Sequence, residues 1–449
     1  MSESVLSLLE QQPDLSKIKR VSEGRSVTVF KVLQKTPDVQ RPQLVRVLHS
    51  IQNHFAIKRE KDLLNYFNQF PEFCRLNEIR KVGFYYLQFF DLKGKRNLQQ
   101  QIEKKGPLSP KKAKKLLAGL VETLKKAHSV TFIHGDIQPS NILVGKKGYN
   151  LIDWSKAIPS LSSFDTESML GGGRYCPPES LNGQYDEKGD IYALGCTLYY
   201  ALTGKHIYRL DKVDETAQQL WAHVHHTPRK LNRLPIFWRY AIVWMTQKEP
   251  SKRPTLDELT VWLEDLTVPE WIRKLSQTPE KSYPEDPLTL LADEHYLYPI
   301  FKKALLHEAS GDLETAFNLY ENCAFQGYSR AENNLGLMYE QGNPINQSYS
   351  MAANMYHNAF EKGNPFAAYN LARLFEEGLG MTQNWQQAHK LYKFAAMRGN
   401  VKAQNALGQL YERGEGVEKD DTQARFWYEI AAHYGHKQAK KNLKALLKA

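Results

Sequence analysis

A 36-residue period runs through the last third of the chain and restricts its fold more than any other feature. One set of repeated positions holds Ala331, Ala367, Ala403 and Ala439, followed four residues later by Leu335, Leu371, Leu407 and Leu443; a second holds Ala316, Ala352, Ala388 and Ala424, followed by Tyr320, Tyr356, Tyr392 and Tyr428. A repeat of this length is typically one helix–turn–helix unit, which buries its apolar face only against its neighbours. The period therefore predicts an all-α solenoid over residues 291–449.

A proline-bearing segment precedes these repeats. Residues 269–290 contain four prolines and scattered charges, and such a composition favours a linker. A chain of 449 residues has room for two or three domains. We therefore expect one further domain over residues 16–268, preceded by an N-terminal extension at residues 1–15.

The chemistry of this domain is concentrated in residues 132–155. Asp136 lies five residues before Asn141, and Asp153 follows the apolar pair Leu151-Ile152. One carboxylate at this spacing can accept the proton of an attacking hydroxyl, while the amide and the other carboxylate hold Mg²⁺ on nucleotide phosphates. The alternative is an ordinary loop in which Asp and Asn serve only turns and helix caps.

This stretch resembles two motifs of the protein-kinase superfamily. His134-Gly-Asp136 with Asn141 is similar to H-R-D-x-x-x-x-N, and Asp153-Trp-Ser is similar to D-F-G. The resemblance implies that Asp136 is the catalytic base, and that Asn141 and Asp153 bind Mg²⁺ beside ATP. It also implies a bilobal α+β protein-kinase-like fold ahead of the solenoid.

Three motifs further along separate protein kinases from small-molecule kinases of the aminoglycoside or choline type. The segment that ends at Glu179 resembles the end of a kinase activation segment, with serines and a threonine between residues 160 and 168 as candidate phosphorylation sites. Asp190 opens an apolar helix, and Arg253 lies in a match to D-P-x-x-R-P-T. The resemblance implies a buried structural pair between Glu179 and Arg253, which the small-molecule enzymes lack.

The start of the domain predicts a nucleotide-binding hairpin. Residues 17–24 and 27–34 alternate apolar and polar side chains, as two paired strands do. The register places Gly24 and Val29 at positions of the kinase glycine-rich loop. Only one of its glycines is retained, so this part of the resemblance is weak.

The phosphate-binding cation has two candidates, Lys58 and Arg46. Arg46 lies in the apolar segment 43–49, at the usual interval after Val29, whereas Lys58 lies in a segment with helical spacing. We therefore expect Arg46 to orient phosphates and to pair with Glu60 on the next helix. The apolar strand at residues 84–91 would run into the hinge, where an adenine would meet backbone groups, with Phe89, Phe90 and Asp91 as candidates.

Several positions depart from the family pattern, and they keep a second function open. The departures are Ser22, Val27, Arg46, Gly135, Gln138, Ser155 and Gly172. The favoured function is an ATP-dependent protein kinase acting on Ser or Thr. The alternatives are a pseudokinase scaffold with weak or no phosphotransfer, and a small-molecule kinase.

The repeats resemble Sel-1-like repeats, which are relatives of tetratricopeptide repeats. The segment from Gly414 to Val417, followed by Trp427-Tyr428, gives the closest match. The resemblance implies that the solenoid binds a protein substrate or partner. This pairing of domains suggests a bacterial protein.

Composition and charge restrict the expected partners and the expected location of the protein. The net charge is +11, with a lysine cluster between residues 104 and 115 that we interpret as a solvated helix face, so nucleic acid is not an expected partner. No apolar run is long enough for a membrane span, and the four scattered cysteines form no metal or disulfide pattern. These features favour a cytoplasmic protein without a membrane partner.

Overall fold

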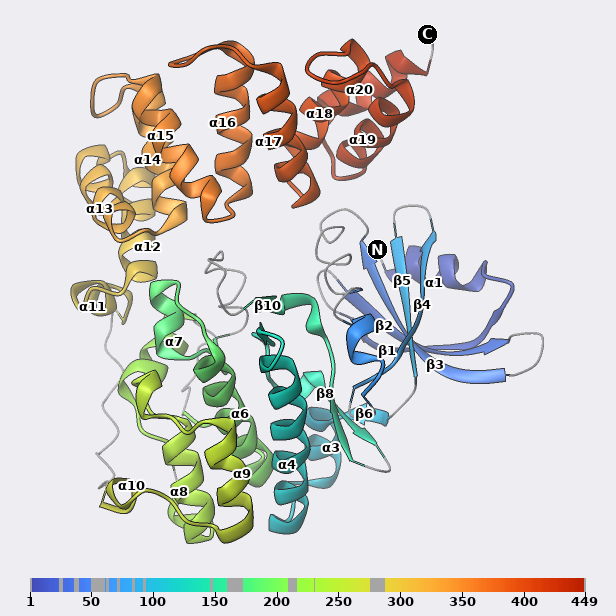
Figure 1. The fold of residues 1–449 in the computed structure, drawn as a ribbon, viewed down its shortest axis with the longest axis vertical. Coiled ribbons are helices and arrows are strands. Elements are labelled where there is room, and N and C mark those ends of the chain that lie inside the picture. Colours follow the sequence, from blue (N-terminus) through green and yellow to red (C-terminus); the bar gives the residue numbers. More distant parts are fainter. Residues whose placement is uncertain are drawn as a thin grey trace.

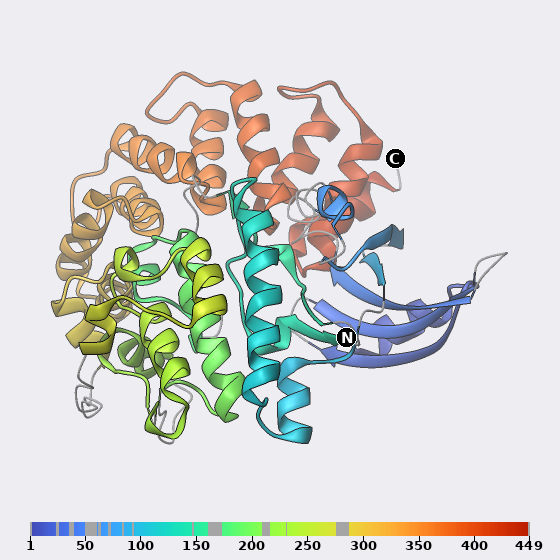
Figure 2. The same cartoon turned by 60° about the horizontal axis from the view of Figure 1, so that its bottom comes forward.

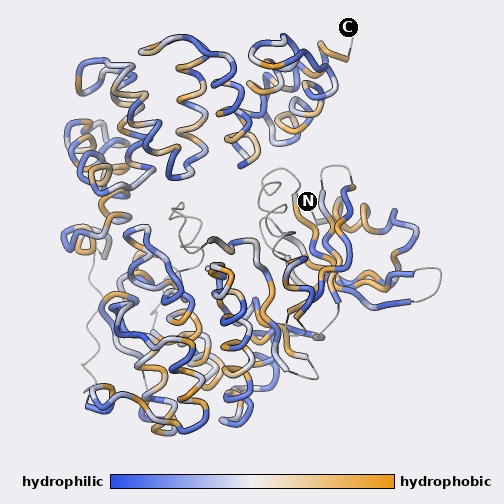
Figure 3. The backbone as a smooth tube through the Cα atoms, in the orientation of Figure 1, coloured by the Kyte–Doolittle hydropathy of each residue, from blue (hydrophilic) through white to orange (hydrophobic). Residues whose placement is uncertain are grey.

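The computed structural model describes residues 2–23, 27–35, 40–49, 61, 64–70, 73–82, 85–91, 94–145, 148–159, 173–208, 216–229, 231–274 and 287–447. The chain forms a sheet-rich first lobe, a helical second lobe and a curved array of helices (Figure 1). Apolar residues occur in all three parts (Figure 3). One buried cluster is shared by the two lobes, while others lie within the first lobe or within the array.

The first lobe is a twisted antiparallel sheet with the order β1-β2-β3-β5-β4. Its strands are β1 (Leu15–Glu23), β2 (Val27–Lys35), β3 (Gln40–His49), β4 (Leu76–Val82) and β5 (Tyr85–Asp91). The hairpin expected at residues 17–34 and the strand expected at residues 43–49 are confirmed. Side chains alternate between the two faces, so Phe30, Val45 and Phe89 face one way, while Leu44 and Phe90 join the main core on the other.

The N-terminal residues form a helix rather than a bare extension. In α1 (Ser2–Glu10), Val5 and Leu9 pack against Phe30 and Phe89 of the sheet. A period of four residues brings two apolar side chains to one face of this short helix. The helix therefore covers the sheet face that points away from the second lobe.

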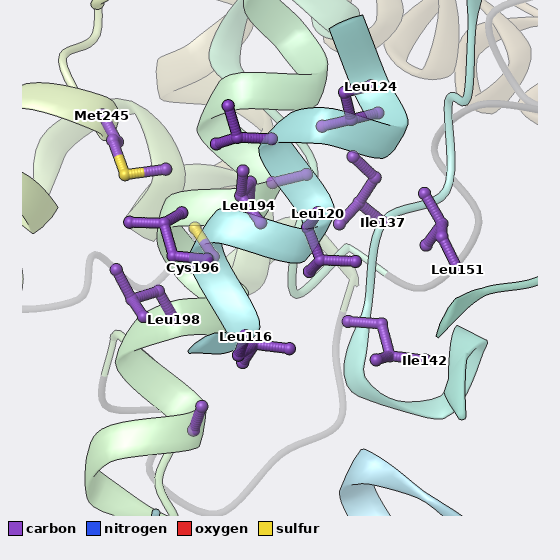
Figure 4. Packing of buried hydrophobic residues seen from close by; sticks show 14 of the residues in the cluster. Leu116, Leu120, Leu124, Ile137, Ile142, Leu151, Leu194, Cys196, Leu198 and Met245 are labelled. Carbon is purple, nitrogen blue, oxygen red and sulfur yellow. The ribbon is translucent and has the colours of Figure 1, made fainter. Parts of the chain in front are cut away.

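The second lobe is built around two long helices. Its helices are α3 (Leu98–Lys105), α4 (Pro110–His128), α6 (Glu187–Thr203), α7 (Thr216–His225), α8 (Ile236–Met245), α9 (Leu256–Asp265) and α10 (Glu270–Lys274). Leu116 and Leu120 of α4 pack beside Leu194 and Leu198 of α6 (Figure 4). Ser109 is the N-cap of α4 and Pro110 its first residue, a combination typical of helix starts.

Short strands connect the helices of this lobe. They are β6 (Gly94–Asn97), β8 (Ile142–Gly145) and β9 (Tyr149–Leu151) in one sheet, and β7 (Phe132–Ile133) with β10 (Ile158–Pro159) in another. Helix α6 begins at Glu187, three residues before the expected Asp190, because the Asp186 carboxylate accepts a hydrogen bond from the Lys188 amide and caps the helix there.

The array consists of antiparallel helix pairs, as the period predicts. Its helices are α11 (Pro287–Asp293), α12 (Leu297–Ser310), α13 (Leu313–Phe325), α14 (Ser329–Gln341), α15 (Tyr349–Glu361), α16 (Pro365–Glu377), α17 (Trp385–Met397), α18 (Val401–Arg413), α19 (Asp421–His433) and α20 (Lys437–Leu446). In each pair from α12 to α19, a buried tyrosine donates a hydrogen bond to a glutamate of the preceding helix. The pairs are Tyr320–Glu308, Tyr356–Glu340, Tyr392–Glu376 and Tyr428–Glu412.

Close helix contact explains a small residue in this array. A Cβ atom on Gly336 would lie 2.5 Å from the ring of Tyr356. That distance is far below van der Waals contact, so the aromatic ring of α15 needs glycine on α14.

The array touches both lobes. Leu291 of α11 and Tyr298 of α12 share an apolar cluster with Leu181, Leu220 and Trp221 of the second lobe. At the far end, the Lys81 ammonium of β4 lies 4.9 Å from the ring centroid of Phe426 in α19. Figures 1 and 2 show the array curving from α7 towards the first lobe.

The segment expected as a linker is partly helical. Helix α10 and the start of α11 fall within residues 269–290, and Ile272 of α10 is buried in the main core. Residues 275–286 lie outside the described part of the chain. Within the described residues, no helix is both long and apolar enough to cross a membrane.

Candidate active site

The three residues expected to carry the chemistry come from neighbouring turns of the second lobe. Asp136 follows β7, Asn141 ends a 3₁₀ turn (Pro139–Asn141), and Asp153 follows β9. The Asn141 amide donates to Asp136 Oδ2 at 3.0 Å and to the Asp136 carbonyl at 2.9 Å. These bonds fix the amide beside the carboxylate, so both side chains present oxygen atoms to the same region.

His134 holds the backbone of this loop in place. Its Nδ1 accepts a hydrogen bond from the Asp136 amide at 3.2 Å, and its Nε2 lies 3.2 Å from the Ile152 carbonyl. A carbonyl can only accept, so His134 carries its proton on Nε2. Burial lowers the pKa of His134, which keeps the ring in this neutral form.

The buried carboxylate of Asp190 holds the backbone of the loop that carries Asp136. Its carboxylate accepts hydrogen bonds from the amides of His134 and Gly135 at 2.8 and 3.0 Å and contacts His128 Nε2 at 3.0 Å. Burial opposes the ionisation of Asp190, but the bonds from His128 and His134 hold its pKa below the usual value. Gly135 has φ 73°, which favours glycine where the family motif has Arg.

Arg46 reaches the site from the first lobe. It lies on β3, between Val29 of β2 and Gln88 of β5, and is 5% exposed. Its guanidinium forms an ion pair with Asp153 Oδ1 at 2.9 Å. Asp153 itself has φ 66°, a left-handed conformation that few residues other than glycine, asparagine and aspartate adopt readily. The strand register inferred for Arg46 is confirmed, whereas its expected partner Glu60 lies outside the described residues.

Trp154 joins the two lobes behind the site. It is 3% exposed, and its ring centroid lies 5.0 Å from Phe67 and 5.4 Å from Phe73, on the side of the first lobe. On the other side it meets His134 edge-on at 4.6 Å. Tryptophan thus fills the place of the motif's phenylalanine, and its packing holds the adjacent Asp153 at the junction of the lobes.

The sequence reasoning missed one contact of Asp136. Lys156 Nζ lies 3.3 Å from Asp136 Oδ1, which also accepts a hydrogen bond from Gln138 Nε2 at 3.0 Å. A basic residue three positions after Asp153 was the only signal for this contact. Its partner could not be inferred, because the pair depends on how β9 and the Asp136 loop meet.

The donor set suits Mg²⁺ held jointly with phosphate. Asn141 and Asp153 would supply one amide and one carboxylate oxygen ligand, and Mg²⁺ is often bound by one or two such groups together with nucleotide phosphates. Among the described residues, no group of three or more His, Cys, Asp or Glu side chains could hold a metal alone. The amide and carboxylate oxygens thus suit Mg²⁺ bound beside phosphate.

The other residues proposed for the nucleotide are not all directed at this site. Val29 lies beside Arg46 and packs against the main core. Phe89 is fully buried on the opposite sheet face, under α1, so its side chain points away from Arg46. Asp91 ends β5 and accepts a hydrogen bond from Asn77 at 2.8 Å, and Gly24 lies outside the described residues.

The predicted pair between Glu179 and Arg253 is confirmed. The guanidinium donates to both carboxylate oxygens of Glu179, at 2.6 and 2.8 Å. It also donates to the carbonyls of Gln247, Lys188 and Lys248, and its side chain is fully buried. The pair ties the end of the activation segment to α6 and to the turn before α9.

Comparison with known families agrees with this geometry. The protein kinase domain family matches residues 15–262, more than half of the chain, and the Sel1 repeat family matches residues 329–364, 365–400 and 401–436. The second match covers the helices from α14 to α19.

Curated relatives are bacterial and eukaryotic kinases. The chain is 32% identical over 179 residues to the probable serine/threonine-protein kinase PkwA of Thermomonospora curvata, covering 39% of this chain and 24% of that protein. It is 37% identical over 112 residues to the serine/threonine-protein kinase PrkC of Bacillus subtilis, covering 24% and 17%, and 31% identical over 137 residues to PknB of Mycobacterium tuberculosis, covering 29% and 21%. The chain thus spans a quarter or less of the length of each of these relatives. From the extent of the first match, this chain belongs to the protein kinase domain family and carries a Sel1 repeat array after the kinase domain.

Proposed function

We propose that the chain is a protein kinase that transfers the terminal phosphoryl group of ATP to a serine or threonine of a protein. Its kinase domain and its similarity to serine/threonine kinases support this function. The observation that carries the proposal is the convergence of Asp136, Asn141 and Asp153 with Arg46 at the junction of the two lobes.

Each residue has a role in this proposal. Asp136 would accept the proton of the attacking hydroxyl, and Arg46 would orient the phosphates from the first lobe. Mg²⁺ held by Asn141 and Asp153 would neutralise charge on those phosphates. Backbone groups of Phe89 and Asp91, at the end of β5, would contact the adenine at the hinge.

One observation favours the alternative of a pseudokinase scaffold. Position 138 has a neutral amide where the family motif has lysine, so Gln138 brings no charge to Asp136. The small-molecule kinase alternative is disfavoured, because the buried bond between Glu179 and Arg253 belongs to the protein-kinase motifs.

Radiolabelled ATP with Mg²⁺ and a generic protein substrate tests the proposal. The full chain should label itself or the substrate, and Asp136→Ala and Asp153→Asn should each lower the rate by about a hundredfold or more. Equal labelling by the Asp136→Ala protein would falsify the mechanism, and no labelling by the unmodified chain would favour the scaffold.

The array is proposed to bind a protein partner or substrate. A bound substrate would be at high effective concentration near Asp136. The first helices of the array also brace the kinase domain, because Leu291 and Tyr298 share a core with α7. A fragment ending near Pro279 would expose that core, so recruitment is better tested in the full chain. Substitutions of exposed residues on α14 to α19 should weaken labelling of the natural partner and leave labelling of a generic protein unchanged.

A further inference from the structure

The Asp136 carboxylate has an ammonium group beside it that comes from an unusual position. Lys156 ends a 3₁₀ turn (Trp154–Lys156) just after the metal-binding Asp153, and its Nζ lies 3.3 Å from Asp136 Oδ1. The catalytic-loop motif that the chain resembles has its lysine at position 138, which is Gln here. Gln138 contacts the same oxygen at 3.0 Å. The amide and the ammonium therefore meet at one atom.

The surroundings distinguish this contact from an ordinary surface ion pair. The side chains of Lys156 and Asp136 are 28% and 17% exposed, and the carboxylate is held by Asn141 as well. An ammonium group has three N–H donors, so Lys156 can serve a phosphoryl oxygen while it contacts Asp136. Lys156 thus lies beside the proposed proton acceptor, with donors left over for a group that reacts there.

We propose that Lys156 is a further catalytic residue, which contacts the transferred phosphoryl group and replaces the charge absent at position 138. This inference rests on the proposed kinase function. Negative charge on the phosphoryl oxygens must be stabilised during transfer, and a cation fixed in advance at that place lowers the barrier. The loss of the motif's lysine is then a relocation of charge from the catalytic loop to the turn after Asp153.

A charge-swap experiment on the full chain tests the relocation. Lys156→Ala should lower kcat about a hundredfold, as removal of one preorganised group in a transition-state site typically does. Adding Gln138→Lys to that variant should restore kcat to within about tenfold of the unmodified chain, because the charge returns to the same carboxylate. A Lys156→Ala protein as active as the unmodified chain, or a double variant no better than the single one, would overturn the proposal.

A matched control comes from α4. Lys125 has the same side-chain exposure, 28%, and also forms an ion pair with an aspartate, Asp257, at 2.7 Å. Lys125→Ala should leave kcat unchanged. Lys156→Gln, which keeps much of the side-chain length, replaces Lys156→Ala if the latter does not fold.

Nucleotide binding provides a readout that does not depend on turnover. By calorimetry with Mg²⁺, Lys156→Ala should weaken a non-hydrolysable ATP analogue about tenfold and leave ADP affinity unchanged, since only the analogue has the terminal phosphate. If Lys156→Ala weakened the affinity for both nucleotides equally, the proposed contact of Lys156 with the terminal phosphate would be wrong. If the unmodified chain transfers no phosphate but this discrimination is seen, the kinase function fails while the contact of Lys156 stands. A chain that binds neither nucleotide would overturn both.

Discussion

Arg46 lies in the first lobe at the position where lysine is usual. Its contacts explain how the site accommodates a planar guanidinium group there. The residue is nearly inaccessible, and its guanidinium is already bound to Asp153. Arginine keeps its charge at any physiological pH and donates in a fixed plane. The side chain therefore holds the Asp153 carboxylate in a fixed position.

Arg46→Ala should reduce kcat/KM for ATP about 10- to 100-fold, because hydrogen bonds to charged groups are worth about 1.5–3 kcal/mol. The matched control is Arg41→Ala, which removes an exposed arginine from the same strand. Steady-state kinetics at varied ATP would measure both. A larger effect of Arg41→Ala would show that Arg46 does not orient the phosphates.

The lowered pKa of Lys248 predicts that the stability of the folded chain depends on pH. Its ammonium donates to Tyr208 Oη at 2.9 Å and to the His223 carbonyl at 2.6 Å, and burial lowers its pKa from the usual 10.5 to about 7. Between these values the unfolded chain holds the proton and the folded chain does not. Raising the pH therefore favours the folded chain, by at most about 1.4 kcal/mol per pH unit.

Lys248→Met should remove this contribution. Denaturant unfolding at pH 7.5 and pH 9 should give a smaller gain in the free energy of unfolding for the variant than for the unmodified chain. Lys252→Met is the control, since Lys252 is exposed. An identical gain in all three proteins would mean that Lys248 keeps its usual pKa.

At the scale of elements, the bond between Glu179 and Arg253 joins segments that are 74 residues apart. Arg253 also accepts, through its carbonyl, a hydrogen bond from Lys188 Nζ at 2.7 Å. The turn before α9, the start of α6 and the end of the activation segment are thus held at one point. This point positions α6, whose Asp190 in turn supports the Asp136 loop.

Arg253→Ala should lower the free energy of unfolding by about 3–5 kcal/mol, because it leaves the Glu179 carboxylate buried without its partner. Arg233→Ala, at an exposed position of the same lobe, should have little effect. Thermal melts of the full chain would compare the two. Equal melting temperatures for both variants would contradict a structural role for the pair.

Helices and strands that have a local sequence signal could be predicted from the sequence. Features that depend on contacts between segments far apart in the chain could not. The strand of Arg46, the start of α4 at Ser109-Pro110 and the helices of the repeats follow from periodicity and capping. Helix α1 is too short for a strong periodic signal, and the contact of Lys156 with Asp136 joins two loops. The burial of the Phe89 side chain under α1 had no local signal either, because the face of a strand depends on a register that a one-residue shift inverts.

At the scale of the whole molecule, the array is attached to the kinase domain rather than tethered loosely. The contact of Leu291 and Tyr298 with α7 buries apolar surface from both parts. Leu297 also donates its amide to the Asn182 side chain at 3.2 Å, close to Glu179. The start of the array therefore has a defined orientation on the second lobe.

Leu291→Ala should destabilise the full chain by about 2–5 kcal/mol, as large-to-small changes in a core do. The adjacent Leu290 is 41% exposed on the same helix, so Leu290→Ala is the control and should cost much less. Denaturant unfolding would measure both. If the two variants were equally stable, the cluster would not hold the array on the kinase domain.

Successive units of the array are joined by equivalent contacts, so the number of units determines how far the array reaches. Asn364 and Asn400 each donate a hydrogen bond to the carbonyl of the first residue of a helix one unit earlier, Ser329 and Pro365 respectively. Because these joints between successive units are equivalent, removing residues 365–400 would bring α14 and α15 against α18 and α19 in the same way. The shortened chain would keep its attachment at α7, but Phe426 would no longer reach Lys81. The number of units thus sets the span of the molecule, and the present number is the one that bridges from the second lobe to the first.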